Sequence, residues 1–462
     1  MTYEAGSAVA DITHARDALG MLELAETDAE SIDRLQALEE LKAACAAAQA
    51  RETAALQARR RQAEADRGVP AARRCNGLGA EVGLARGDSP ARGARHLRVA
   101  CALVEGLPNT MQALQSGGIH EEHAQIVVKE TSWLAADHRR QVDALIADRL
   151  GTLGPRKLAT AVQGYAQELD QLTAVEQRER AESERRVSMR PAPGGMAYLS
   201  ALVPMQQAVG IYAGLRRDAT NMVGTGETAD PADPSGQPRT RDQIMADLLV
   251  QRLTGQATAR AVPAEVHVVM TDEALFGDGD TPAWLIGQGP IPASTALQWI
   301  ADPEAEMFLR RVFTRPKERQ LVGLESRSRS FPPGLRRMVA LRDDTCRTPY
   351  CDAAIQDIDH ILAVKDGGTT SWSNAQGLCG ACNQIKENTG WRHEATADQL
   401  TVTTPTGHRY TTNTAPIRTA KDPPDPGSRP DARPPENNPP PITLSSCAMM
   451  RNTIQYSIRV AA

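Results

Sequence analysis

The sequence has few aromatic residues, little net charge and no long apolar run, and each shortage excludes a class of protein. Its 462 residues include 5 Trp, 7 Tyr and 4 Phe, which disfavours a β-sandwich or barrel, whereas alanine-rich runs such as residues 43–50 favour helices. No window approaches 18 uninterrupted apolar residues, so we expect no membrane-spanning helix. The net charge of −5 excludes both a uniformly basic nucleic-acid coat and an extremely acidic tail protein.

The beginning of the chain also lacks the marks of an exported protein. The first residues, MTYEAGSAVADITHARD, carry acidic side chains early and have no basic end followed by an apolar stretch. We therefore expect a cytoplasmic protein with no membrane partner. Because 462 residues are more than one hydrophobic core usually serves, the length predicts two or three domains.

Hydrophobic periodicity predicts how these domains follow one another. It indicates an N-terminal helical region over residues 1–95 and a mainly helical domain over residues 96–340, with a linker-like loop at 224–240. β-Branched residues at 262–270 predict a few strands within this helical part. Residues 394–413 have the pattern of a β-hairpin, and the proline-rich sequence that follows predicts a disordered tail over residues 414–462.

The N-terminal helices are predicted to have one apolar and one charged face, beginning at a capping box formed by Thr27 and Glu30. Such a face can pack on a partner helix, so self-association through these helices is one interpretation. The heptads are not sustained along the segment, which favours packing on helices of the same chain.

Four of the eight cysteines fall within 37 residues of one another, as two pairs. Cys346 and Cys351 are separated by four residues, and Cys379 and Cys382 by two. In a reducing cytosol such a cluster indicates a metal site before disulfides. Two thiolate pairs can converge into a closed tetrahedral Zn²⁺ site, which would hold a segment too poor in apolar side chains to fold alone. The alternative is four buried cysteines without a ligand, but paired spacings rarely arise by accident.

The sequence around these cysteines resembles the motif of HNH endonucleases. The matching positions are Asp359-His360, the Gly367-Gly368-Thr369 turn, Asn374, Leu378-Cys379, Cys382-Asn383 and Lys386. The resemblance implies a small α+β module over residues 341–393, in which a β-hairpin and a helix (the ββα-metal fold) surround one divalent ion. The chain departs from the motif at Ala363, where many relatives have proline, and at Asn383, where many have histidine and asparagine is an accepted variant.

The chemistry of phosphodiester cleavage gives these residues distinct roles. Cleavage needs a base that deprotonates water and a cation that stabilises charge on the phosphate. Imidazole suits the base at neutral pH, so we expect His360 to be the base and Asp359, on the opposite side of the strand, to bind Mg²⁺ or Mn²⁺. The resemblance implies Asn383 as a second ligand of that ion and Asn374 as the residue that ties the loop and orients the histidine. The plainer alternative is a structural histidine beside a capping carboxylate.

A positively charged stretch precedes the module. From Arg310 to Arg347 the sequence has eleven basic residues against four acidic ones, in a chain that is acidic as a whole. Attraction of phosphate is a sufficient use for such a stretch, so we expect DNA contacts from Arg336, Arg337 and Arg342. Lys386, one turn beyond Asn383 on the same predicted helix, is a further candidate. The alternative for each is an ordinary solvated cation.

The resemblance also extends upstream of the module. Segments at 106–127, 239–255, 287–296 and 327–351 are similar to those of high-GC bacterial proteins that place a helical domain of unknown function before an HNH module. These proteins form a multi-copy repeat family, often associated with mobile elements. The resemblance implies a metal-dependent DNA endonuclease stabilised by zinc. A zinc-stabilised DNA-binding or regulatory protein that does not cleave is the first alternative, and a helical domain whose main function is protein interaction is the second.

Overall fold

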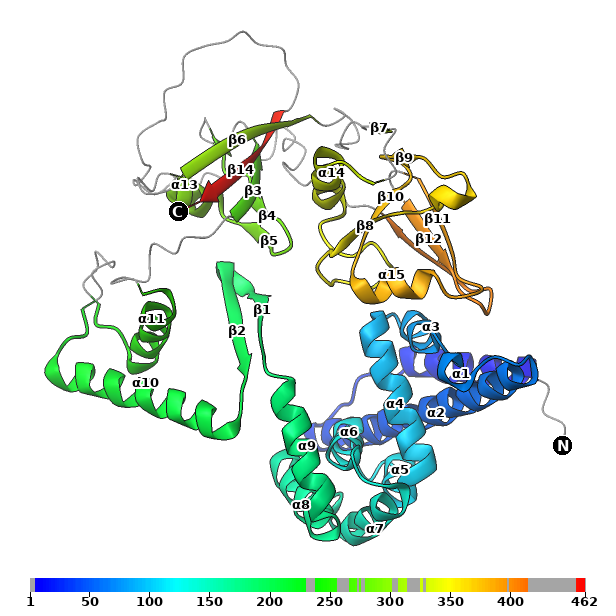
Figure 1. The fold of residues 1–462 in the computed structure, drawn as a ribbon. Helices are drawn as coiled ribbons and strands as arrows, with labels where there is room; N and C mark the ends of the chain where they lie inside the picture. The colour runs from blue at the N-terminus through cyan, green and yellow to red at the C-terminus, as the bar shows by residue number, and fades with distance from the viewer. Residues whose placement is uncertain are drawn as a thin grey trace, which may run out of the picture. The chain divides into compact units, whose positions relative to one another are not determined.

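The computed structural model of the chain describes residues 5–229, 237–255, 266–271, 274–275, 279–300, 306–313, 325–326, 330–396, 399–413 and 454–461. It divides into two compact units, Met1–Gly83 with Ala91–Gln177 and Leu84–Pro90 with Arg178–Ala462. The prediction of a mainly helical chain with a few small sheets and a small C-terminal α+β module is confirmed (Figure 1). Among the described residues, no helix combines the length and apolarity needed to cross a membrane.

In its described residues, the first unit is helical. Its helices are α1 (Ala5–Gly20), α2 (Asp28–Asp66), α3 (Leu78–Ala85), α4 (Pro90–Gly106), α5 (Pro108–Gln115), α6 (Glu121–Thr131), α7 (Ala136–Ile146), α8 (Pro155–Leu169) and the first part of α9 (Gln171–Ser183). Helix α2 begins at the predicted cap, since Thr27 Oγ1 accepts a hydrogen bond from the Glu30 backbone N at 3.2 Å. Helices α5 and α8 each begin with a proline. At this position the missing backbone N–H costs nothing, because it would have no partner within the helix.

Alanines let the long helix α2 approach its neighbours closely. Ala43, Ala47 and Ala50 are buried in one hydrophobic core with residues from α4 to α8, among them Leu107 and Leu114. The predicted boundary at residue 95 is therefore not a boundary in the structure, because α2 and the later helices share this core.

A buried carboxylate fixes the start of α5. Asp143 of α7 is fully buried, and its two oxygens accept hydrogen bonds from the backbone N and the side chain of both Asn109 and Thr110, at 2.6 to 3.1 Å. These bonds satisfy donors at the first turn of α5 that have no partner within the helix. The carboxylate therefore joins α7 to α5.

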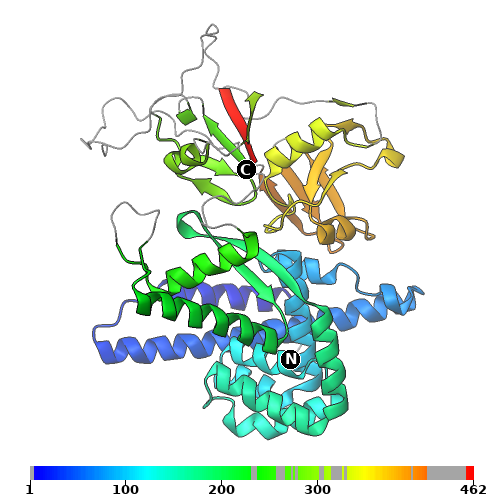
Figure 2. The ribbon, with the colours of Figure 1, turned by 60° about the vertical axis from the view of Figure 1, so that its left-hand side comes forward.

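The second unit contains several small sheets. Strands β1 (Arg186–Ala192) and β2 (Met196–Leu202) form a hairpin, followed by helices α10 (Met205–Thr225) and α11 (Arg241–Thr254), which pack side by side (Figure 2). A five-stranded sheet has the order β5-β4-β3-β14-β6, from β3 (Val266–Thr271), β4 (Ala283–Leu285), β5 (Gly289–Ile291), β6 (Glu306–Phe313) and β14 (Ile454–Ala461). Helix α13 (Ala293–Ile300) packs on this sheet. Strand β3 confirms a strand within 262–270, although residues 262–265 lie outside the described residues.

Strand β14 differs from the predicted tail. The prediction of disorder covers residues 414–462, of which 414–453 lie outside the described residues. Ile454–Ala461 instead pairs antiparallel with both β3 and β6. The alternation of β-branched and polar residues in this segment suits a strand, but its pairing partners lie more than 140 residues earlier in the chain.

The C-terminal module has the expected hairpin and helix. Strands β8 (Asp357–His360) and β10 (Ala375–Leu378) pair antiparallel, and helix α15 (Gly380–Lys386) follows directly. Helix α14 (Pro333–Asp343) covers the hairpin through Leu335 and Val339. After the module, β11 (Arg392–Ala395), β12 (Gln399–Thr403) and β13 (Arg409–Asn413) form a three-stranded sheet, where the sequence predicts only a hairpin.

Replacement of Asp143 by alanine is expected to destabilise the helical unit by about 3 kcal/mol, because it leaves buried donors of α5 unsatisfied. Chemical denaturation followed by circular dichroism measures the free energy of unfolding. Asp148→Ala serves as the control, because Asp148 is an exposed carboxylate in the short 3-10 helix Ala147–Arg149 that directly follows α7. Equal stability of the two variants would contradict the role of Asp143.

Candidate active site and metal centre

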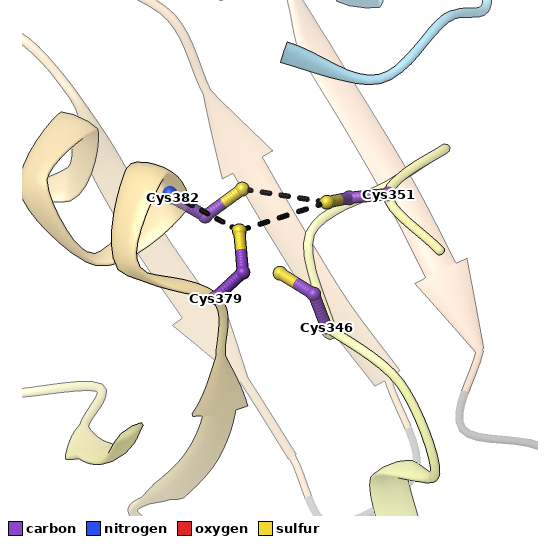
Figure 3. Close-up of side chains that lie close together, drawn as sticks. All are labelled: Cys346, Cys351, Cys379 and Cys382. Carbon is purple, nitrogen blue, oxygen red and sulfur yellow. Dashed lines mark hydrogen bonds between the residues drawn. The ribbon is translucent and has the colours of Figure 1, made fainter. Parts of the chain in front are cut away.

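The four clustered cysteines converge at one point of the module (Figure 3). Cys346 and Cys351 lie in the loop after α14, Cys379 caps α15 and Cys382 lies in its first turn. Their sulfur atoms all lie within 4.8 Å of one another, with Cys351 Sγ 3.9 Å from Cys379 Sγ and 3.7 Å from Cys382 Sγ. A tetrahedron with Zn–S bonds of about 2.3 Å has edges of about 3.8 Å. The separations therefore fit a zinc ion with four thiolate ligands.

The electrostatics of the cluster also favour a cation. Hydrogen bonding with Cys351 lowers the pKa of Cys346, and the same contact raises the pKa of Cys351. The pKa of Cys382 is raised by its own hydrogen bond with Cys346. One thiolate is thus stabilised by its neighbours, but four thiolates this close repel one another unless a cation lies between them.

Helix α15 faces one side of strand β8. The Nζ of Lys386 is paired with the carboxylate of Asp359 and donates a hydrogen bond to the His360 carbonyl at 2.8 Å. One turn earlier, Asn383 Nδ2 donates to Asp357 Oδ2 at 3.3 Å. Alternation along the strand places Asp357 and Asp359 on this side. The predicted ligands Asp359 and Asn383 therefore lie on facing elements, with oxygen atoms of the kind that Mg²⁺ and Mn²⁺ prefer.

The imidazole of His360 lies on the other side of β8. Its Nε2 is 2.9 Å from Thr370 Oγ1, and its ring centroid lies 4.3 Å from that of Phe331. The ring is only partly buried. It is thus held at both its face and its polar end while it retains access to solvent.

Asn374 ties the loop that joins β8 to β10. Its Oδ1 accepts from the Leu362 backbone N at 2.9 Å, and its Nδ2 donates to the carbonyls of Leu362 and Thr369 at 3.0 and 2.8 Å. The loop also requires both glycines of its turn. Gly367 has a φ of 90°, and a Cβ on Gly368 would lie 1.8 Å from the Leu362 carbonyl oxygen.

The structure gives Arg342 a role other than the predicted contact with DNA. Its side chain is buried, donates to the carbonyls of Trp372 and Ala375 at 2.9 and 2.7 Å, and pairs with Asp343. Arg347 is buried beside it and also pairs with Asp343. A charge count cannot detect this arrangement, because it gives no information on which arginines point into the module. These guanidinium groups hold the hairpin to α14.

The other predicted DNA contacts have different surroundings. Lys386 has only 9% of its side chain exposed and is held by Asp359, so its charge is already neutralised. Arg336 and Arg337 are exposed on α14 and remain available. Arg310 and Arg311 belong to β6, whose side chains are not described, and the basic residues at 315–329 lie outside the described residues.

Two residues without a predicted role connect to the site. Gln376 is fully buried, and its side chain bridges the His360 carbonyl, at 3.4 Å, and His393 Nδ1, at 3.0 Å. Burial, and then the charge of Lys386, lowers the pKa of His393 to about 4. Gln376 lies opposite Asp359 in the β8–β10 register. No sequence signal marks Gln376 or His393 as part of the site.

This pKa predicts that the module loses stability in acid. An unfolded histidine takes up a proton near pH 6.5, whereas His393 in the fold resists it until about pH 4. The unfolded state therefore binds more protons between these values, and stability falls as the pH is lowered through this window. Thermal unfolding of the parent and His393→Gln at several pH values measures the effect. The stability difference between the two should change across the window, and a constant difference would contradict the assignment.

Comparison with known proteins agrees with the geometry. A family model described as a domain of unknown function (DUF222) matches residues 36–343, and one described as HNH endonuclease matches residues 345–389. The comparisons with curated proteins and with solved structures found no match. The second match covers the hairpin, α15 and all four clustered cysteines, and the first covers more than half of the chain. The chain therefore belongs to the DUF222 family, with an HNH endonuclease domain after the helical region.

Proposed function

We propose that the chain is a metal-dependent DNA endonuclease that hydrolyses phosphodiester bonds. The observation that carries the proposal is the arrangement of β8, β10 and α15, which gathers Asp359, His360, Asn374 and Asn383 around one hairpin within the segment matched by the HNH model. These residues supply a base, oxygen ligands and a loop tie, which phosphodiester hydrolysis requires.

In this proposal His360 accepts the proton of the attacking water. Thr370 holds the imidazole through Nε2, and Phe331 packs against its ring. Asn374 is a positioning residue, because its three hydrogen bonds fix the loop that begins two residues after His360. A loosened loop would allow the imidazole to rotate away from the nucleophile.

Asp359 and Asn383 would hold a divalent cation, Mg²⁺ or Mn²⁺. When bound, such an ion supplies positive charge next to the phosphate and the leaving oxygen. The carboxylate and amide oxygens fit this ion by type. Since Lys386 is paired with Asp359, the lysine must release the carboxylate for the ion to bind there, and we infer that cation binding and the Lys386 contact are mutually exclusive.

Zn²⁺ at the four cysteines would have a structural role. The site joins the loop after α14 to the first turn of α15, so it fixes the helix that carries Asn383. Four protein ligands leave no open position for water or substrate.

A non-cleaving DNA-binding protein is the second candidate function. The ion pair between Lys386 and Asp359 favours it, because a carboxylate held by a lysine binds a catalytic cation less readily. The zinc site and the exposed Arg336 and Arg337 serve this function equally well.

Replacement of Cys382 by serine is expected to remove the zinc and unfold the module, because metal affinity and folding are coupled. The helical unit should melt at an unchanged temperature. Metal analysis combined with calorimetry measures both effects, and Cys45→Ser, an exposed cysteine of α2, is the matched control. A Cys382→Ser protein with a folded module and no zinc would contradict the proposal.

Replacement of His360 by alanine should lower plasmid cleavage by about a hundredfold or more, since a positioned base contributes that much. Zinc content, fold and DNA affinity should stay unchanged. The measurement is nicking of supercoiled plasmid with and without Mg²⁺ or Mn²⁺.

Asp359→Ala and Asn383→Ala provide the comparison. Both should weaken cation binding rather than remove the base, so excess Mg²⁺ or Mn²⁺ should restore part of their activity by mass action. No cation concentration should restore His360→Ala. If His360→Ala cleaves as fast as the parent, with contaminating nucleases excluded, the non-cleaving function becomes the better account.

A further inference from the structure

The helical unit contains a cleft that the HNH site does not use. Residues of α2, α4, α6 and α7 line a cavity of about 790 Å³. All of these residues belong to the first compact unit, so the cleft is a property of that unit alone.

The cleft is positively charged. Five basic side chains line it, from Arg61, Arg95, Arg98, Lys129 and Arg139, against the two carboxylates of Glu105 and Glu122. The sequence around it is also basic, with ten arginines and four acidic residues from Arg59 to Arg98. This is a second basic stretch, far from the one that precedes the HNH module.

Arg95 and Arg98 lack the partners that other arginines of this unit have. Arg34 pairs with Glu30, Arg59 with Glu52 and Arg140 with Asp137. Arg95 and Arg98 are exposed on successive turns of α4, and among the described residues the structure gives neither an ion pair nor a side-chain hydrogen bond. Cations this close, about 5–6 Å between Cβ atoms, repel each other unless an anion lies between them.

Neutral side chains also line the cleft. Leu97, Ala102 and Ile126 contribute apolar surface. The Cys101 thiol donates a hydrogen bond to Gln57 Oε1, and burial, followed by the charge of Glu105, raises its pKa to about 11. Beside these partly buried neutral groups, an anion interacts more strongly with the arginines than it would in open solvent.

We propose that this cleft binds the phosphate backbone of DNA, with Arg95 and Arg98 contacting neighbouring phosphates of one strand. The inference rests on the proposed function for its choice of DNA as the polyanion. Arg342 and Arg347 of the HNH module are buried and contribute no phosphate contact. The cleft would supply phosphate contacts that these two arginines do not make. Backbone contacts position a protein on DNA without reading its sequence.

The test measures DNA binding by the full chain carrying His360→Ala, so that cleavage does not interfere. A fluorescent duplex is titrated at several salt concentrations. Arg95→Glu with Arg98→Glu should weaken binding by about tenfold to a hundredfold and reduce the slope of log affinity against log salt by about two. Arg95→Lys with Arg98→Lys should keep most of the affinity, and thermal unfolding verifies the fold of each variant.

The matched control is Arg16→Glu with Arg51→Glu, which changes the net charge equally at exposed arginines of the same unit that do not line the cleft. Unchanged binding by the cleft variant, or an equal loss in the control, would overturn the proposal. Inorganic phosphate and ATP form a further arm. If they raise the melting temperature of the parent but not of the cleft variant, and DNA affinity is the same in both, the site binds small anions and the proposal also fails.

These outcomes are separable from those of the proposed function. A chain that binds DNA through the cleft but never cleaves plasmid supports the inference and refutes the nuclease. A chain that cleaves plasmid and loses its DNA affinity only on charge reversal of Arg336 and Arg337 refutes the inference and leaves the nuclease intact.

Discussion

The candidate active site depends on the convergence of four sulfur atoms. They join the loop that enters the β8–β10 hairpin to the helix that leaves it, and their separations of 3.7 and 3.9 Å match the edges of a ZnS₄ tetrahedron. The hairpin is short, with four residues in each strand, and the apolar cluster beneath it is small. Such a hairpin is at best marginally stable on its own, and a metal ion held by the four cysteines would supply the missing constraint.

A second constraint acts on the backbone of strand β10. Arg342 and Arg347 share the buried carboxylate of Asp343, whose Oδ2 also accepts the Gly377 backbone N at 2.7 Å. The guanidinium group of Arg342 also stacks on the Trp372 ring at 4.6 Å. Arg342 and Arg347 belong to the basic stretch that the sequence suggests for DNA contact, but in the structure they stabilise the module. This is why we place a further phosphate-binding surface in the helical unit.

Local spacing and motif order explain which features could be predicted from the sequence. The paired cysteine spacings predicted the convergence of the four sulfur atoms, and the alternation in Asp359-His360 predicted side chains on opposite sides of a strand. Features set by distant partners could not be predicted. The carbonyls that bind Arg342 come from about 30 residues later, the pairing of Lys386 with Asp359 joins a helix to a strand, and β14 inserts between strands far earlier in the chain. The alanines of α2 are typical of any helix, and only packing shows that they share a core with residues after 91.

The central claim is that one zinc ion with four sulfur ligands organises the HNH module. Zinc K-edge X-ray absorption on protein purified without chelators and without added metal tests it directly. The account predicts one zinc per chain, with only sulfur neighbours at about 2.3 Å. Zinc surrounded by oxygen or nitrogen ligands, or a folded module that contains no zinc, would contradict it.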